Sequence, residues 1–420
     1  MKFAHLADCH IGGWRDEKMQ ALSVDAFQKA IDISISEGVD FILIAGDLFN
    51  TSIPAIDKIK SVVVALKRLR EKDIPVYIIA GSHDFSPSGK TMLDVLEEAD
   101  LFKNVCKGSV VEGKLKLDFT IDEKTGAKIT GMLGKKGMLD RTYYSELLRE
   151  DLEKEEGFKI FMFHTAITEL KTKELQRMDS EPVSILPKNF NYYAGGHVHI
   201  IKHEDFDSHT NVVYPGPVSP NNFPELVKLR NGSMYLYSDG QIKQVPIITK
   251  KVETIEINCN HMTPMKVEHK LQSTVADGMF RDKIVTIRLF GTLESGRPSD
   301  INMKEVFDEL YEKKAYFVLK NTHKLQSKEF QNTSVVQDTV QEIEEALIDE
   351  DWGKLSVLGA DKKDEVGLIK NLMHVWSSEK HEGEKVADYE SRIIEQSEKL
   401  TESLIGNQRS HISSNTDNSS

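Results

Sequence analysis

The chain has little cysteine, no long apolar run and no excess of positive charge, and each absence excludes a class of protein. Cys9, Cys106 and Cys259 are the three cysteines in 420 residues, and they have no paired spacing. The sequence therefore predicts neither a disulfide framework nor a zinc ribbon. No run of about 18 apolar residues could span a membrane, and the N-terminus has the pattern of a core strand rather than of a cleavable signal. We expect a soluble protein in a reducing, cytoplasmic compartment.

The shortage of positive charge is concentrated at one end of the chain. The formal net charge is −13, but residues 331–420 carry 9 Lys and Arg against 19 Asp and Glu. The first 330 residues are therefore nearly neutral, so that this part is not excluded from binding a polyanion. Salt should weaken such binding less steeply than it does for a strongly basic protein. The length allows two or three domains.

Five polar clusters each follow an apolar run that has the character of a buried strand. The runs at 2–7, 41–45 and 76–80 alternate with segments whose apolar residues recur every three or four positions, which predicts a βαβαβ unit. The runs at 159–163 and 192–194 predict two further strands. Ligands gather at the carboxyl edge of such strands. We therefore expect one rim to hold Asp8-x-His10, Gly46-Asp47, Gly81-Ser82-His83-Asp84, His164 and Gly196-His197-x-His199.

These residue types are suited to a pair of catalytic divalent metal ions. Two ions that hold the attacking and the leaving oxygen of a phosphodiester need an anionic ligand between them, and Asp47 is the expected bridge. Asp8 and His10 are two positions apart, which in an extended segment puts them on one side. We expect them to bind the first ion together with His199.

The second ion is expected to be bound by His164 and His197, with a contribution from Ser82. Mixed carboxylate and imidazole ligands favour manganese, iron or zinc over magnesium or calcium, which prefer oxygen. We expect two Mn²⁺ ions per subunit. The composition of the ligand set leaves iron and zinc as alternatives.

His83 and Asp84 are the expected catalytic pair. His83 would donate a proton to the leaving oxygen or stabilise charge in the transition state. Asp84 follows it directly and would fix the orientation of the imidazole ring.

At these residues the chain resembles the calcineurin-like metallophosphoesterases, whose motifs run DxH, GD, GNH[DE], H and GHxH. The stretches MKFAHLADCHIG, FILIAGDLF and GGHVH are similar, within that group, to the nuclease subunit of the Mre/Rad (SbcCD-type) double-strand-break repair complex. The resemblance covers roughly residues 1–225 and is weak beyond them. It implies a four-layer αββα sandwich and a manganese-dependent nuclease that acts on DNA ends, as an exonuclease on duplexes and an endonuclease on single strands.

The resemblance also implies residue roles and partners. The partners would be an ABC-type, SMC-like ATPase and a second copy of the chain, in a homodimer formed through helices near 57–70 and 91–99. The apolar residues Met92, Leu93, Val95 and Leu96 allow such a dimer and equally allow a buried helix in a monomer. The implied metal ligands are Asp8, His10, Asp47, His164, His197 and His199, and the implied catalytic histidine is His83.

Two positions depart from the family pattern. Ser82 replaces the Asn of GNHD, and its hydroxyl is a shorter and poorer metal ligand than an amide oxygen. Asn50 stands where many relatives have a histidine after GDLF. Asn50 cannot titrate near neutral pH, although it could still contact DNA.

Taken with this resemblance, the sequence predicts four segments: a nuclease domain at 1–249, a capping α/β domain at 250–330, a helical ATPase-binding segment at 331–378 and a mostly flexible acidic and polar tail at 379–420. Strands are expected at 253–257, 283–290 and 315–319, and a helix at 303–313. Two amphipathic stripes would either bind the ATPase or pack on the capping domain. They are formed by Val336, Val340, Ile343 and Leu347, and by Val366, Ile369, Leu372, Met373 and Trp376.

Two other functions stay open at this point. The chain could be a phosphatase or small-molecule phosphodiesterase on the same fold, which would cleave nitrophenyl esters but not DNA. It could also be a non-catalytic subunit that binds DNA ends, in which Ser82 marks a lost metal site. The presence of His83, Asp84 and all the other expected ligands argues against this second alternative.

Overall fold

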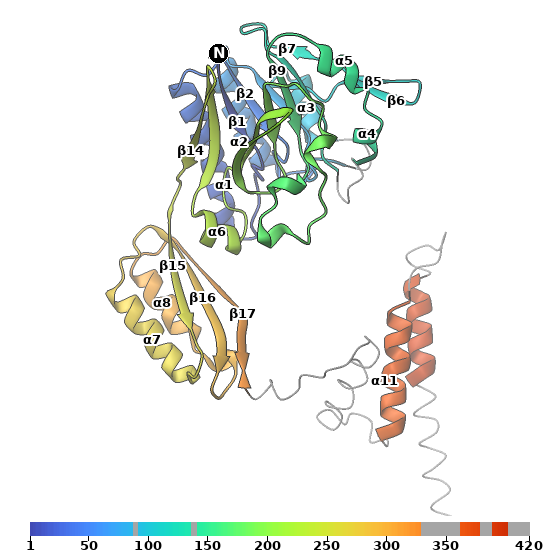
Figure 1. The fold of residues 1–420 in the computed structure, drawn as a ribbon. Helices are drawn as coiled ribbons and strands as arrows, with labels where there is room; N and C mark the ends of the chain where they lie inside the picture. Colours follow the sequence, from blue (N-terminus) through green and yellow to red (C-terminus); the bar gives the residue numbers. More distant parts are fainter. Residues whose placement is uncertain (87–90, 136–140, 329–361, 379–388, 402–420) are drawn as a thin grey trace, which may run out of the picture. The chain divides into compact units, whose positions relative to one another are not determined.

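The computed structural model describes residues 1–86, 91–135, 141–328, 362–378 and 389–401. The chain divides into two units, Met1–Glu329 and Phe330–Ser420. Two six-stranded sheets form the centre of the first unit (Figure 1). The first sheet has the order β14-β13-β1-β2-β3-β4. Its strands are β1 (Lys2–Leu6), β2 (Phe41–Ala45), β3 (Val76–Ile79), β4 (Lys103–Asn104), β13 (Gly232–Ser238) and β14 (Gln241–Ile247).

Strands β1 to β4 of the first sheet are parallel. Beside β1, β13 is antiparallel to β1, and β14 is antiparallel to β13. Every residue of β2 and β3 is buried, as expected for continuous apolar runs covered on both faces. Pro246 lies in β14, an edge strand, where its missing N–H is tolerated.

The second sheet has the order β11-β12-β10-β9-β8-β7. Strands β8, β9, β10 and β12 run parallel, with antiparallel β7 and β11 at the two edges. The strands are β7 (Thr120–Ile121), β8 (Lys128–Gly131), β9 (Lys159–Phe163), β10 (Tyr192–Gly195), β11 (Ile201–Phe206) and β12 (His209–Pro215). The predicted strands at 159–163 and 192–194 are therefore present.

An apolar layer joins the inner faces of the two sheets. Phe3 of the first sheet stacks on Phe41 at 5.0 Å between ring centroids and meets Tyr192 of the second sheet edge-on at 5.0 Å. Such aromatic pairs add to the stabilisation from their buried area. The side chains that fill this layer come from both sheets and include Leu43, Tyr77, Ile129, Ile160, Met162 and Val213.

Helices cover the two outer faces and complete four layers. Three helices pack on the first sheet: α1 (Glu17–Ser36), α2 (Ile56–Arg70) and α3 (Met92–Glu98). The short helices α4 (Arg141–Ser145) and α5 (Arg149–Lys154) lie with several 3₁₀ turns over the second sheet. An exposed hairpin is formed by β5 (Gly108–Val111) and β6 (Lys114–Leu117). The predicted αββα sandwich is confirmed.

A smaller α/β unit follows β14. Its three parallel strands are β15 (Lys251–Asn258), β16 (Lys283–Leu293) and β17 (Phe317–Ser327), and α7 (Pro264–Asp277) and α8 (Met303–Glu312) pack on one face of this sheet. The sequence prediction missed α7 and made all three strands too short, and it began the third strand two residues early. Val252 and Ile284 share an apolar cluster with Met19 and Leu22 of α1. The domain boundaries at 249 and 330 stay predictions.

The second unit is described only in part. The second predicted stripe lies on α11 (Lys362–Trp376), and residues 389–401 are helical. The indole of Trp376 donates to Ser397 Oγ at 3.0 Å, and the Tyr389 hydroxyl donates to the carbonyl of Ser378 at 3.1 Å, so the two helices are in contact. The stripe from Val336 to Leu347 lies outside the described residues.

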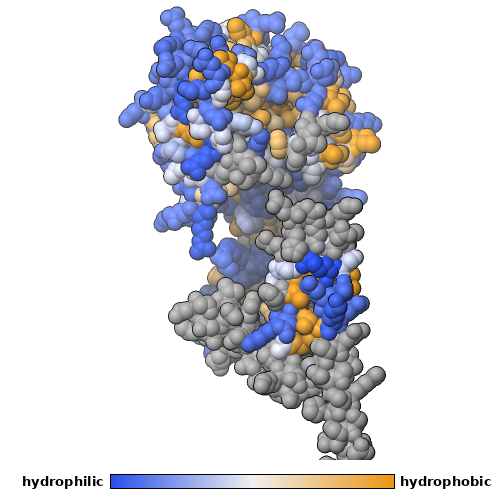
Figure 2. Space-filling model, turned by 90° about the vertical axis from the view of Figure 1, so that its right-hand side faces the viewer, coloured by the Kyte–Doolittle hydropathy of each residue, from blue (hydrophilic) through white to orange (hydrophobic). Residues whose placement is uncertain are grey.

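One face of the described chain is mainly polar. On the face that Figure 2 shows, hydrophilic residues dominate and hydrophobic ones form small separate patches. No helix among the described residues has the length and apolar content that a bilayer crossing requires.

Candidate metal centre

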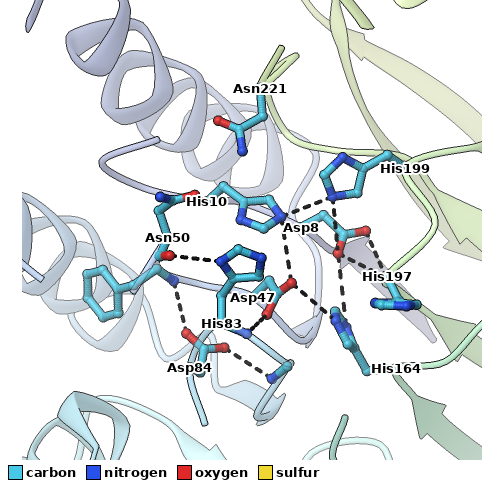
Figure 3. Close-up of polar contacts among 12 residues, drawn as sticks. Asp8, His10, Asp47, Asn50, His83, Asp84, His164, His197, His199 and Asn221 are labelled. Atoms are coloured by element: carbon cyan, nitrogen blue, oxygen red, sulfur yellow. Dashed lines mark hydrogen bonds and ion pairs between the residues drawn. The ribbon is translucent and has the colours of Figure 1, made fainter. Parts of the chain in front are cut away.

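The five predicted clusters meet at the carboxyl ends of β1, β2, β3, β9 and β10. Asp8 lies two residues beyond β1, Asp47 two beyond β2, and His164 directly follows β9. The loops after β3 and β10 bring His83, His197 and His199 to the same rim (Figure 3). Parallel strands place their carboxyl ends along one edge, which is why residues up to 191 positions apart converge.

Most of the expected ligands have a left-handed backbone. The φ angles are 50° at Asp8, 42° at His10, 52° at Asp47, 94° at His197 and 43° at His199. Non-glycine residues rarely adopt positive φ, and such strain clusters at functional sites. The expectation that Asp8 and His10 share one side of an extended segment is wrong in its reasoning, because a left-handed turn rather than strand alternation brings them together.

Asp8, His10 and His199 form the first group of ligand atoms, all within 4.8 Å of one another. His10 Nε2 lies 2.9 Å from His199 Nε2, which lies 3.8 Å from Asp8 Oδ1. The Asp8 carboxylate also accepts from the backbone N–H of His197 through both oxygens, at 2.9 and 3.1 Å. The predicted first set is therefore brought together.

Asp47 occupies the middle of the site. Its Oδ2 lies 3.2 Å from His164 Nε2 and 3.6 Å from His10 Nε2, and its Oδ1 accepts from the N–H of His83 at 2.7 Å. Asp47 belongs to two groups of potential ligands, one with His10 and His83 and one with Asp8 and His164. This central placement is what a bridging carboxylate requires.

His164 and His197 lie side by side, with ring centroids 5.2 Å apart. His164 Nδ1 lies 2.9 Å from the carbonyl of Ala45, and because a carbonyl only accepts, Nδ1 carries the hydrogen. The lone pair of a neutral His164 ring is therefore on Nε2, the atom that faces Asp47. Two members of the predicted second set, His164 and His197, are thus adjacent, although His197 is absent from the close groups of ligand atoms found among the described residues.

Burial and the nearby carboxylates divide the histidines of the site into those with a raised pKa and those with a lowered pKa. Burial opposes the charged form of His164, but Asp47 and Asp8 outweigh it and raise its pKa to about 10. In the same way Asp8 and Glu225 overcome burial and raise the pKa of His199 to about 9. Burial lowers the pKa of His10 to about 3 and, with the nearby charge of His164, that of His197 to about 4. The site therefore attracts positive charge to particular nitrogen atoms.

His83 is oriented by a backbone carbonyl. Its Nδ1 lies 2.8 Å from the carbonyl oxygen of Asn50 and must donate to it, which leaves Nε2 to hold or accept a proton. The ring stands perpendicular to that of His10, with 4.7 Å between centroids. Asn50 thus contributes to the site through its backbone. The predicted DNA contact of its side chain stays a prediction.

The predicted role of Asp84 needs correction. Its Oδ1 accepts from the N–H of Phe49 at 3.0 Å, and its Oδ2 accepts from those of Leu48 and Gly81, both at 3.1 Å. The carboxylate is thus engaged by three backbone amides, and the His83 ring is oriented by Asn50. Asp84 ties the loop after β2 to the turn that carries His83. Sequence adjacency suggested a contact that the turn does not make.

Ser82 and two glycines complete the turns around the ligands. Ser82 is buried between Gly81 and His83, and its role as a ligand stays a prediction. Gly46 has φ +88°, and a Cβ there would lie 2.1 Å from His164 Nδ1. A Cβ on Gly81 would lie 2.3 Å from Asp47 Oδ1. Both positions therefore need glycine for close approach, and Gly46 needs it for its left-handed conformation as well.

The sequence reasoning missed Glu225, which lies in α6 (Phe223–Leu229). Its Oε1 lies 2.8 Å from His199 Nδ1 and its Oε2 accepts from the N–H of Asn221 at 2.7 Å. Ligand histidines commonly donate their other ring N–H to a carboxylate. The signal was available, because Asn222 caps this helix and an Asn-x-x-Glu pattern marks a helix start.

The donor atoms fit divalent metal ions. The Nδ1–H groups of His164 and His199 point to Ala45 and Glu225, so the lone pair of each neutral ring lies on Nε2. These lone pairs face a carboxylate oxygen at 3.2 Å and another imidazole nitrogen at 2.9 Å. Two acceptors as close as His164 Nε2 and Asp47 Oδ2 need a cation between them, either a proton or a metal ion, whereas a neutral His10 ring can present either a lone pair or an N–H to His199. Buried imidazole and carboxylate ligands favour a transition metal.

Comparison with known proteins identifies the class that this fold and site define. Residues 1–200 match the model of the calcineurin-like phosphoesterase family. Residues 1–200 therefore form a calcineurin-like phosphoesterase domain.

The chain is similar to several proteins named DNA double-strand break repair protein Mre11. It is 29% identical to that of Archaeoglobus fulgidus over 287 residues, which is 64% of this chain and 62% of the relative. Identity to the Methanococcus maripaludis protein is 31%, over 47% of this chain and 52% of the relative. Identity to the Sulfolobus acidocaldarius protein is 26%, over 70% and 76%. The match to the first two thus covers only about half to three fifths of their length.

Proposed function

We propose that this chain is a divalent-metal-dependent DNA nuclease that hydrolyses phosphodiester bonds at DNA ends during double-strand-break repair. The observation that carries the proposal is the convergence of Asp8, His10, Asp47, His164 and His199 around atoms that need a cation. The similarity to proteins named DNA double-strand break repair protein Mre11 supports DNA as the phosphoester substrate. The substrate would be cut as a duplex by exonuclease and as a single strand by endonuclease activity.

The ligands would be those predicted from the sequence, with Ser82 the weakest. Asp8, His10 and His199 would hold one ion and His164, His197 and Ser82 the other, with Asp47 common to both. When bound, two Mn²⁺ ions would supply the charge that stabilises the attacking and the leaving oxygen. Glu225 and the carbonyl of Ala45 hold the His199 and His164 rings so that Nε2 points into the site.

His83 would act as the general acid of the reaction. The Asn50 carbonyl holds Nδ1–H, so that the remaining ring nitrogen, Nε2, can carry a second proton and give it to the leaving oxygen. The N–H of His83 is anchored on Asp47. The imidazole is therefore fixed relative to the central carboxylate. In this arrangement Asp84 supports catalysis indirectly, because it holds the loop to which Asn50 belongs.

Two protein partners are part of the proposal. An ABC-type, SMC-like ATPase would bind the helical C-terminal segment, where Trp376 is 61% exposed. A homodimer would form through α2 and α3, where Ile56 is 84% and Val95 58% exposed. Leu93 and Leu96 are buried in the core of the sandwich, so they would support the interface without contacting the second copy.

The test is a cleavage assay on end-labelled duplex and single-stranded DNA with Mn²⁺. The wild type should cut both, and His83→Ala should reduce the rate by roughly 10²- to 10⁴-fold, the usual contribution of general acid catalysis. Exposed His203 provides the control, because His203→Ala should cut like the wild type. Hydrolysis of nitrophenyl esters without cleavage of DNA would instead establish a phosphatase. Binding of DNA ends with no hydrolysis of any ester would establish a non-catalytic subunit.

A further inference from the structure

A lysine held between two aromatic rings lies beside the metal centre and has no place in the ligand set. The Nζ of Lys135 lies 5.0 Å from the centroid of the Phe85 ring and 4.4 Å from that of the Tyr143 ring. It also donates to the Tyr143 hydroxyl at 2.5 Å. We call Phe85, Lys135 and Tyr143 the aromatic cradle.

The backbone places the cradle at the rim of the site. The N–H of Gly134 donates to the carbonyl of Ala80 at 2.9 Å, and a Cβ on Gly134 would lie 2.5 Å from Cδ2 of His164. Lys135 is the next residue, so its Cα is about 3.8 Å from that of Gly134. Phe85 follows the His83-Asp84 pair, and its N–H donates to Gly81. The cradle is therefore connected directly to one ligand and to the turn of the catalytic histidine.

No described carboxylate forms an ion pair with Lys135. Other lysines of the same unit form ion pairs, for example Lys103 with Glu123 and Lys283 with Glu253. Within the part of the chain that the structure describes, Lys135 has no ion pair with Asp or Glu. Aromatic faces attract an ammonium group but contribute no net negative charge. The cradle fixes a full positive charge next to the site and leaves it available to an anion.

We propose that Lys135 binds a phosphate of the polynucleotide next to the phosphate that is cleaved. This inference rests on the proposed nuclease function and names a residue that selects polynucleotides over small diesters. A lysine acts on phosphate as a point charge with three donors, and only one of these is used by the Tyr143 hydroxyl. A small diester has a single phosphate, which the metal centre takes, and it has nothing to place at Lys135.

The experiment compares two substrates of the metal-loaded protein, a single-stranded oligonucleotide and bis(4-nitrophenyl) phosphate. Lys135→Met should raise the KM for the oligonucleotide roughly tenfold, since a charge-assisted hydrogen bond to phosphate is lost. The loss of kcat/KM should be about tenfold greater for the oligonucleotide than for the small diester. The plot of log affinity against log salt should be shallower by about 0.7, the value for one contact to a single strand.

Matched variants separate a DNA contact from a structural role. Lys135→Arg keeps the charge and should restore most of the affinity and the salt slope. Lys72→Met removes an exposed lysine beyond the end of α2 and should change neither substrate preference nor slope. Equal losses on both substrates, or an unchanged salt slope, would show that the cradle only holds the loops together and would overturn the inference. If the wild type cuts the small diester but no DNA, the proposed function itself fails.

Discussion

Asp84 offers a sharp test of what holds the metal centre in shape. Asp84→Asn keeps the size of the side chain but replaces one carboxylate oxygen with an NH₂ group. The carboxylate accepts from three backbone amides, those of Leu48, Phe49 and Gly81. The amide oxygen of Asn can still serve the two that share Oδ2. The third, Phe49 N–H, would face a second donor and lose its partner.

The magnitude follows from two opposing effects. A buried N–H without a partner costs about 1–3 kcal/mol, and hydrogen bonds to a neutral acceptor are weaker than those to a carboxylate. Against this, burial and the nearby charge of Asp47 raise the pKa of Asp84 to about 7, so the ionised carboxylate is itself costly to bury and Asn removes that cost. We expect the hydrogen bonds to dominate and the free energy of unfolding to fall by about 2 kcal/mol.

Urea unfolding at pH 8, where the carboxylate of the wild type is mostly ionised, measures this difference. Asp84→Ala should cost more than Asp84→Asn, because all three amides lose their partner. Asp118 is exposed, so Asp118→Asn should stay within about 0.5 kcal/mol of the wild type. The affinity for Mn²⁺ should fall along with stability in both Asp84 variants, since Asp84 ties the loop of Asp47 to the turn of His83.

The result that would refute this reasoning is an Asn variant as stable as the wild type. It would mean that relief of the buried charge compensates fully for the lost acceptor. Asp84 would then be a source of strain rather than the tie between the two loops. A variant of unchanged stability with a large loss of activity would return Asp84 to a direct role at the imidazole of His83.

Three further predictions address other parts of the molecule. Glu225→Gln removes the charge behind His199 and should weaken Mn²⁺ binding roughly tenfold in a calorimetric titration, whereas unchanged affinity would limit Glu225 to capping α6. Ser82→Asn should tighten the second metal site, and identical Mn²⁺ stoichiometry and affinity in the same titration would contradict this. Burial lowers the pKa of His5 to about 3. His5 is therefore protonated at higher pH in the unfolded chain than in the folded one, and stability falls as pH drops below about 6.5. Between pH 7 and 5 this effect should lower the free energy of unfolding of the wild type by about 2 kcal/mol. In urea melts His5→Gln should lack this decrease, and the exposed control His269→Gln should show all of it.

The fold could be predicted because its central strands are short apolar runs that are buried on both faces. Buried parallel strands tolerate few polar residues, so each polar cluster marked the end of a strand. The same property located the ligands, since parallel strands share an edge. The helix α7 was missed although Thr263 caps it, Pro264 begins it, and Val267, Leu271 and Val275 are spaced by four. The sequence of α7 therefore carries the start signal and the apolar spacing that mark a helix.

The supporting contacts could not be predicted from adjacency in the sequence. Asp84 follows His83, yet its carboxylate binds the loop after β2. His83 is oriented by a backbone carbonyl of Asn50, and a backbone group leaves no trace in the residue type. Such contacts depend on how two loops fold against each other. Their φ and ψ angles are set by the assembled sandwich and not by local propensity.

The left-handed backbone at the ligands depends on contacts between the loops after β1 and β2. Asp8 and Asp47 occupy a conformation that costs roughly 1–3 kcal/mol per residue unless surrounding contacts impose it. The contacts are present, because Asp8 N–H donates to Gly46 and His10 N–H donates to Asp47, and Ile11 N–H donates to Leu48. The loops after β1 and β2 therefore hold each other in the strained form. Ligands fixed in this way lose little further freedom when a cation binds, so the cost of ordering the site is met during folding rather than at each binding event.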